Sequence, residues 1–112
     1  PRHFEQWHAE TPDGFVFSLK ANRFATNRRE LGSAGESIQR FMESGIDRLA
    51  DKLGPIVWQL MPTKRFEPAD FAAFLALLPR EAGGRRLRHV IDARHPSFDC
   101  EAYLELLHRH GC

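Results

Sequence analysis

The stretch "RHVIDARHPSF", at residues 88–98, combines a strand pattern with a cluster of charged side chains. Its first half is typical of a buried strand, because two β-branched apolar residues stand at its centre. Asp92, Arg94 and His95 then crowd the end of that strand. Charged residues are rarely buried without a partner or a function. The stretch therefore predicts a strand whose carboxyl end lies at a functional site.

Two similar strands precede this one, and helical patterns separate all three. The sequences "FVFSLKA" (15–21) and "PIVWQL" (55–60) are short, apolar and bounded by turn residues. Apolar residues at helical spacing predict a helix before, between and after the strands. Such alternation favours an α/β fold with parallel strands joined by right-handed crossovers. Four helices are expected. The first covers 2–9, and the second runs from a capping box at Ser33 and Glu36 to Gly54. The third runs from Pro68 to Pro79, and the fourth covers 100–109.

Polar side chains recur at the carboxyl ends of all three predicted strands. Side chains alternate between the two faces of a strand, so Lys20, Gln59, Asp92 and Arg94 are expected on one common side. Ligands of α/β folds bind at the carboxyl ends of the parallel strands. In a closed barrel that common side is the interior. The pattern therefore favours a barrel segment over an open sheet. The alternative to a ligand site is that Asp92 and Arg94 only form an ion pair with each other.

The predicted elements form an incomplete barrel. The last helix ends at residues 111–112, where a further strand is expected, and three parallel strands alone leave two edges open. We therefore expect residues 1–112 to be a single partial domain, with the amino- and carboxyl-terminal parts of the barrel missing.

Composition limits the partners and the compartment. The formal net charge is only +1, which gives no bulk electrostatic reason to expect nucleic acid or an acidic membrane surface. No apolar run approaches the roughly 20 residues of a membrane span. The two cysteines, Cys100 and Cys112, are too few for a disulfide framework and lack a zinc-binding spacing. We therefore expect a cytoplasmic protein.

Three ordered motifs carry a resemblance to a known family. The segments "FVFSLKANRFAT", "KLGPIVWQLMP" and "IDARHPSF" together resemble the domain-of-unknown-function 72 family, the YecE-like proteins. The resemblance implies a TIM-barrel-like fold, of which this chain would supply about strands three to five. It implies no settled reaction, and the cofactor remains unknown.

The family motifs carry over residue by residue, with departures. Lys20 matches the lysine that ends the "F-x-F-x-x-K" strand of the family. Gln59 matches the "Q-L-P-P" motif, in which Met61 replaces the first proline. Asn27 stands where the family usually has a histidine after a threonine, so this chain lacks the acid/base group or metal ligand that a histidine would supply there. The family motif "E-x-R-H" is matched by Asp92, Arg94 and His95, with aspartate in place of glutamate.

These residue types suit an anionic ligand. Arg94 offers a planar fork of donors, which matches carboxylate or phosphate groups. A histidine side chain can serve as a general acid or base, which is one role for His95; capping the following helix, or bonding the backbone at the His95-Pro96 turn, is the alternative. We expect no metal site, because too few ligands converge. The predicted catalytic residues are Asp92, His95 and Lys20, and the predicted ligand-binding residues are Arg94, Gln59, Arg23, Arg28 and Asn27.

Three classes of function stay open at this point. The first is an enzyme of barrel type that acts on an anionic, for example phosphorylated, small molecule. The second is a protein that binds or acts on nucleic acid, suggested by Arg23, Arg28 and Arg29 in the long polar connection after the first strand. The third is a binding module without catalysis. The oligomeric state is not indicated by the sequence.

Overall fold

The chain folds into a three-stranded parallel sheet with helices on one face. The computed structural model describes residues 2–12, 14, 16–21 and 26–112. None of the helices in these ranges is long and apolar enough to cross a bilayer. The helices are α1 (Arg2–Glu10), α3 (Gly35–Met42), α4 (Pro68–Leu77) and α5 (Glu101–Arg109), and the strands are β1 (Phe17–Lys20), β2 (Leu53–Gln59), β3 (Glu81–Ala82), β4 (Arg85–Arg86) and β5 (His89–Asp92).

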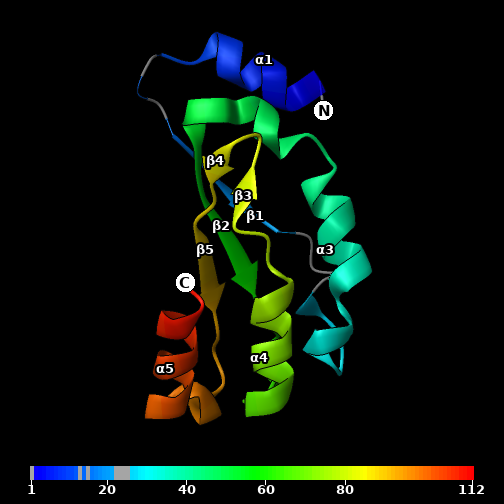
Figure 1. Ribbon diagram of the computed structural model, residues 1–112, viewed down its shortest axis with the longest axis vertical. Coiled ribbons are helices and arrows are strands. Elements are labelled where there is room, and N and C mark those ends of the chain that lie inside the picture. The colour runs from blue at the N-terminus through cyan, green and yellow to red at the C-terminus, as the bar shows by residue number, and fades with distance from the viewer. Residues whose placement is uncertain (1, 13, 15, 22–25) are drawn as a thin grey trace.

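The main sheet has the strand order β1-β2-β5, and both neighbouring pairs are parallel. Lys20 pairs with Val57, and Gln59 pairs with Asp92, so the three strands end at one edge of the sheet (Figure 1). The predicted α/β fold with parallel strands is confirmed. A crossover helix between successive parallel strands explains why the chain alternates between strand and helix.

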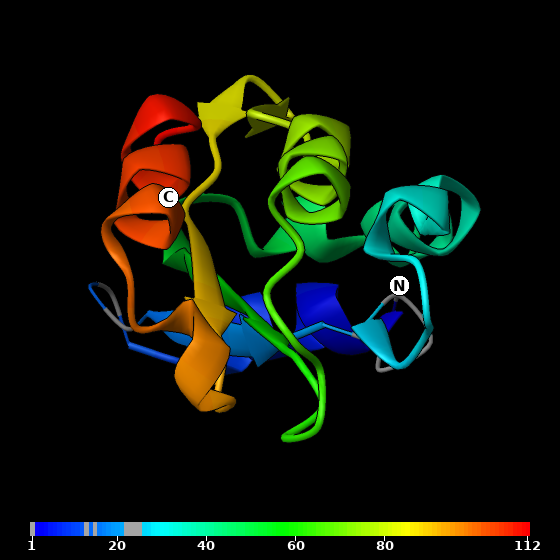
Figure 2. The same cartoon turned by 90° about the horizontal axis from the view of Figure 1, so that it is seen from below.

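One face of the sheet carries the core. Helices α3, α4 and α5 all lie on this face (Figure 2). Trp58, on β2, is fully buried and contacts Phe41 of α3 and Phe74 of α4 edge to face. Aromatic edge-to-face contacts add to the free energy of apolar burial. The alternating burial along β2 is the result of one covered face and one open face.

The other face of the sheet is uncovered. Val90 is 45% exposed there, although it is apolar and β-branched. Its register partner is Val57, which is also the partner of Lys20 and alternates with Gln59, so Val90 lies on the same side as Lys20, Gln59 and Asp92. The predicted common side of these polar residues is therefore present, toward the carboxyl ends of an otherwise apolar face.

The predicted extent of the second helix, from Ser33 to Gly54, is wrong. Helix α3 ends at Met42, and Gly45 reverses the chain with a φ of 99°, a value that favours glycine. A 3-10 helix then covers Ile46–Lys52, and Gly54 lies inside β2. The apolar periodicity continued across two shorter elements, because both pack against the same core.

The predicted capping box is also wrong. Helix α3 begins after Ala34, which makes no side-chain cap, and the hydroxyl of Ser33 donates instead to the carbonyl of Glu30. Ser33 is part of a short 3-10 helix, Leu31–Ser33, in which Leu31 is fully buried. The polar connection before α3 therefore includes an anchored turn that its composition concealed.

Helix α1 lies across the amino-terminal ends of the strands, opposite the polar edge (Figure 1). Lys52 is 4% exposed and holds the end of this helix, because its ammonium group donates to the carbonyls of His8 and Thr11. A short antiparallel hairpin, β3–β4, turns at Gly83 and Gly84 near the same end. The hairpin was not predicted, because two-residue strands have too little periodicity to detect.

Candidate functional site

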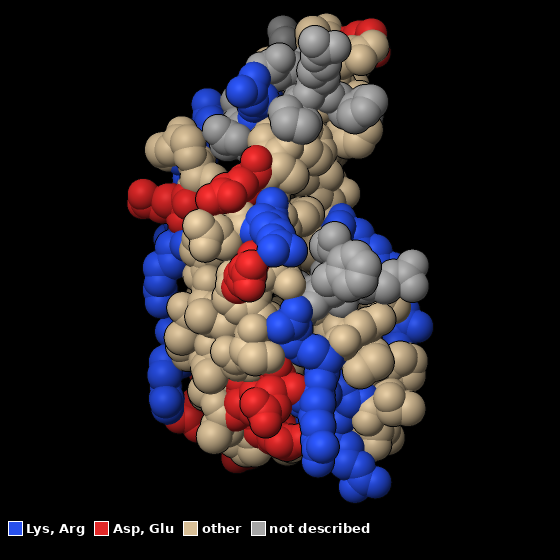
Figure 3. Space-filling model, turned by 90° about the vertical axis from the view of Figure 1, so that its right-hand side faces the viewer, with Lys and Arg blue, Asp and Glu red and all other residues tan. Residues whose placement is uncertain are grey.

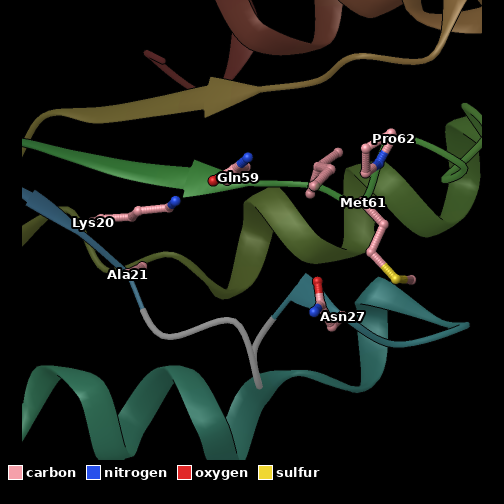
Figure 4. Close-up of a pocket in the computed structure, with 7 residues that line it drawn as sticks. Lys20, Ala21, Asn27, Gln59, Met61 and Pro62 are labelled. Carbon is pink, nitrogen blue, oxygen red and sulfur yellow. The ribbon is translucent and has the colours of Figure 1, made fainter.

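Lys20, Asn27 and Gln59 line one hollow at the carboxyl ends of the strands. The hollow has a volume of about 460 Å³, and its remaining walls are Ala21, Leu60, Met61 and Pro62. In Figure 4 the ends of the Lys20 and Gln59 side chains point toward one another, and the amide of Asn27 lies across the hollow from them. The structure thus brings together a cation, two amides and an apolar wall.

Strand pairing explains how Lys20 and Gln59 reach the same space. The backbone N–H of Ala21 donates to the carbonyl of Val57 at 2.8 Å, which fixes the end of β1 against β2. Lys20 is opposite Val57, and Gln59 follows two residues later on the same face. Lys20 is exposed and Gln59 is half-buried. The parallel register alone is enough to bring the side chains of Lys20 and Gln59 to the same space.

Asp92 and Arg94 lie one strand farther along the same edge. The guanidinium of Arg94 donates to Oδ2 of Asp92 at 3.3 Å, and the two side chains are 55% and 38% exposed. Asp92 is paired with Gln59 in the register, but neither charged residue belongs to the lining of the hollow. An ion pair this exposed stabilises the fold by at most about 1 kcal/mol. The pair therefore stands beside the hollow on the same edge.

His95 takes the capping role. Its Nδ1 accepts a hydrogen bond from the backbone N–H of Ser97 at 3.1 Å, and the hydroxyl of Ser97 lies 2.9 Å from the same nitrogen. This caps the 3-10 helix Pro96–Phe98. The hydroxyl of Ser97 also accepts from the backbone N–H of Phe66 at 2.7 Å, so the cap joins the loop after β5 to the loop after β2.

The arginines of the connection after β1 differ in their surroundings. Arg23 lies outside the described residues. Arg28 donates to the carbonyl of Ser33 at 2.8 Å and to the hydroxyl of Ser37 at 2.9 Å, so its guanidinium fastens its own loop to α3. Arg29 is exposed. Of the predicted residues in this connection that the structure describes, Asn27 alone lines the hollow.

The chain matches one protein family along its whole length. Residues 1–112 match the family described as "Protein of unknown function DUF72". The chain belongs to the DUF72 family. The membership predicted from the three motifs is confirmed.

A solved structure gives an independent comparison with this DUF72 chain. A DUF72 family protein from Thermotoga maritima superimposes with a TM-score of 0.68 at 23% sequence identity. The superposition covers 98% of this chain and 42% of that protein, so this DUF72 chain spans less than half the length of its relative. This likeness shows the fold. No curated protein matches the chain significantly.

Two side chains of the DUF72 chain were not anticipated from the sequence, the buried Lys64 and the partly buried Asp70. The ammonium group of Lys64 donates to the carbonyl of Arg29 at 2.6 Å and lies 3.4 Å from Oδ2 of Asp70. The carboxylate of Asp70 also accepts from the backbone N–H groups of Leu31 and Gly32, both at 2.8 Å. An aspartate in the first turn of a helix usually interacts with the dipole of its own helix. Nothing in the sequence indicates that this one caps a distant turn.

A third missed residue is His89, in the core of the DUF72 fold. The indole N–H of Trp58 donates to Nδ1 of His89 at 2.9 Å, and Nε2 of His89 lies 2.6 Å from the carbonyl of Pro79. The acceptor role of Nδ1 means that Nε2 carries the proton in the neutral ring. Burial lowers the pKa of His89, and the hydrogen bond to Pro79 offsets this only in part. His89 is a structural, neutral histidine.

The described part of the DUF72 chain contains no group of three or more His, Cys, Asp or Glu side chains that could hold a metal ion. The candidate site is the hollow that Lys20, Asn27 and Gln59 line. A lysine with neutral donors beside it suits an anionic oxygen, since each can donate a hydrogen bond to it.

Proposed function

We propose that the hollow at the carboxyl ends of β1 and β2 binds a small ligand through an anionic group, a phosphate or a carboxylate. Lys20 supplies the charge, and Asn27 and Gln59 supply hydrogen bonds that orient the ligand. The observation that carries this proposal is the convergence of these three side chains on one hollow of about 460 Å³. That volume lies in the range of small-molecule sites.

The proposal includes the surroundings of the hollow in the whole protein. We propose that β1, β2 and β5 are neighbouring strands of a TIM-barrel-like domain, with the uncovered face turned to the interior. The exposed Val90 supports this, because bulky branched residues fill barrel interiors. The 42% coverage of the solved relative leaves enough chain for the other strands. The ligand would then lie at the open mouth of the barrel.

In this proposal Asp92 is the proton acceptor. It lies on the same face as Gln59 and its carboxylate is partly exposed, so a bound ligand that extends across β2 reaches it. The site then has an anion-holding side at Lys20 and a carboxylate side at Asp92. Catalysis on this plan would need a ligand with an exchangeable proton, and Arg94 would orient the carboxylate.

The test is a binding titration with the intact protein. Inorganic phosphate and succinate are titrated separately, which distinguishes a phosphate site from a carboxylate site. Lys20→Met should weaken binding of the preferred anion by about 10- to 100-fold, since a hydrogen bond to a charged group contributes roughly 1.5–3 kcal/mol. The matched control is Arg88→Met, which removes an exposed cation just before β5, at the other end of the sheet. Equal loss in both variants, or binding of neither anion, contradicts the proposal.

The nucleic-acid alternative receives less support from the described residues. Of the two described arginines that suggested it, Arg28 donates to Ser33 and Ser37. On the flank that carries α3, basic and acidic side chains lie side by side over the lower half (Figure 3). A phosphate-tracking surface needs a continuous basic stripe. We also propose a cytoplasmic location, because Cys100 and Cys112 are both free thiols.

A further inference from the structure

Two loops form the outer walls of the hollow, and the side chains of Lys64 and Asp70 join them. The connection before α3 contributes Asn27, and the loop between β2 and α4 contributes Met61 and Pro62. Lys64 follows in this second loop, where its backbone N–H donates to the carbonyl of Met61 at 2.9 Å. Its side chain crosses to the first loop and donates to the carbonyl of Arg29 at 2.6 Å. Lys64 therefore contacts the segments on both sides of the hollow.

Asp70 completes the connection from α4. One carboxylate oxygen accepts from the N–H of Leu31 and the other from the N–H of Gly32, both at 2.8 Å. The approach is close, because a Cβ atom on Gly32 would lie 3.0 Å from Cβ of Ala73 and 3.3 Å from Oδ1 of Asp70. Burial raises the pKa of Asp70, but the two N–H groups and Lys64 outweigh it, so the pKa is lowered overall. The carboxylate is thus held in its charged, accepting form.

We propose that Lys64 and Asp70 are positioning residues of the ligand site, which hold the Asn27 loop against the Met61–Pro62 loop. This inference rests on the proposed function for its ligand, but its structural content is independent of the ligand. The Lys64 side chain is 6% exposed and the Asp70 side chain 17%. A buried ammonium group is costly unless it is paired. Its two nearest partners on other segments, the carbonyl of Arg29 and the carboxylate of Asp70, both fix the position of the Asn27 loop, and the carboxylate of Glu67 lies farther away at 3.8 Å.

The fold provides a matched control for this role. Lys52 is as buried as Lys64, at 4% against 7% exposure, and its ammonium group donates to the carbonyls of His8 and Thr11. It lies at the amino-terminal ends of the strands, however, where it holds α1. Lys52→Met and Lys64→Met remove the same atoms, and each removes a donor to a backbone carbonyl. They release different segments, the end of α1 in one case and a wall of the hollow in the other. Lys64 also lies 3.4 Å from the carboxylate of Asp70, and Asp70→Asn tests that contact separately.

The experiment combines hydrogen exchange and phosphate binding in the intact protein. In Lys64→Met and in Asp70→Asn, exchange of the amides of Leu31 and Gly32 should accelerate by about tenfold or more, because local opening then costs less. Affinity for inorganic phosphate should fall by about three- to tenfold, because a displaced Asn27 loses its contact. Lys52→Met should change neither the exchange of residues 31 and 32 nor the affinity.

The two readouts separate the two proposals. Unchanged exchange at Leu31 and Gly32 in folded Lys64→Met protein overturns the positioning role, whatever the affinity does. Faster exchange with unchanged phosphate affinity also overturns it, because the loop then moves without consequence for the site. Failure of the wild-type protein to bind phosphate or succinate overturns the proposed function, and with it the assignment of these residues to a ligand site. Where a variant does not fold, the conservative Lys64→Arg is measured in its place.

Discussion

Gly54 offers the sharpest test of the way β1 and β2 are joined. Gly54 lies in β2 next to the start of β1, where the register of the pair shifts. A Cβ atom at this position would lie 2.5 Å from Cγ1 of Val16 and 2.8 Å from the carbonyl oxygen of Phe17. Val16 is half exposed and can rotate away. The carbonyl of Phe17 belongs to the backbone and cannot.

The cost of Gly54→Ala follows from these distances. Restoring an ordinary 3.4 Å contact from 2.8 Å requires a backbone shift of about 0.6 Å in the β1–β2 pair. Shifts of this kind in a packed core cost about 1–3 kcal/mol. The usual gain of roughly 0.4–1 kcal/mol from replacing glycine by alanine offsets only part of this. We expect the free energy of unfolding to fall by about 1–2 kcal/mol.

Gly35→Ala is the matched control for this substitution. Gly35 opens α3, and a Cβ atom there meets only Cδ2 of Leu77 at 3.6 Å, an ordinary contact. The control should therefore stabilise the protein by about 0.4–1 kcal/mol. Urea denaturation measures both variants, through a midpoint that moves while the slope stays constant. Equal stability of the two variants would refute the close approach of β1 to β2.

Three further results are expected. Because burial lowers the pKa of His89, this histidine binds a proton more readily in the unfolded chain than in the folded one. The free energy of unfolding should therefore fall as the pH drops below about 6.5, by about 1.4 kcal/mol for each pKa unit between the two states. His89→Gln should flatten this dependence in a denaturation series from pH 7 to 4. Trp58→Phe should cost about 1–3 kcal/mol beyond its lost packing, because Nδ1 of His89 loses its donor; a neutral result in urea denaturation contradicts that hydrogen bond. Asp92→Asn should strengthen phosphate binding by about twofold, since the repulsion between the Asp92 carboxylate and a phosphate held at Lys20, roughly 10 Å away in water, contributes about 0.4 kcal/mol. Weaker binding in the titration would make Asp92 a ligand contact.

The parallel sheet and its polar edge were predictable from the sequence. Alternation of strand and helix patterns determines the topology, and the period of two along each strand determines the shared face. Lys20 and Gln59 could be placed together on these grounds alone. The location of Asp92 one strand away follows from the same register.

The parts that were not predictable depend on contacts between distant residues. Whether His95 caps a turn or faces a ligand depends on Ser97 and on the loop that Ser97 meets. The internal hydrogen bonds of Arg28 depend on how its loop returns to α3. Lys64 and Asp70 appear as ordinary surface residues in the sequence, because their partners are mainly backbone groups that carry no sequence signal. Short 3-10 helices and the two-residue strands of the hairpin leave equally little periodicity.

A crystal structure of the intact protein with inorganic phosphate tests the central claim most directly, since the claim concerns the position of an anion. The account predicts phosphate in the hollow, with an oxygen within hydrogen-bond distance of Nζ of Lys20 and of the Gln59 amide. Phosphate bound elsewhere, with Lys20 turned out of the hollow or paired with a carboxylate of the protein, would contradict it.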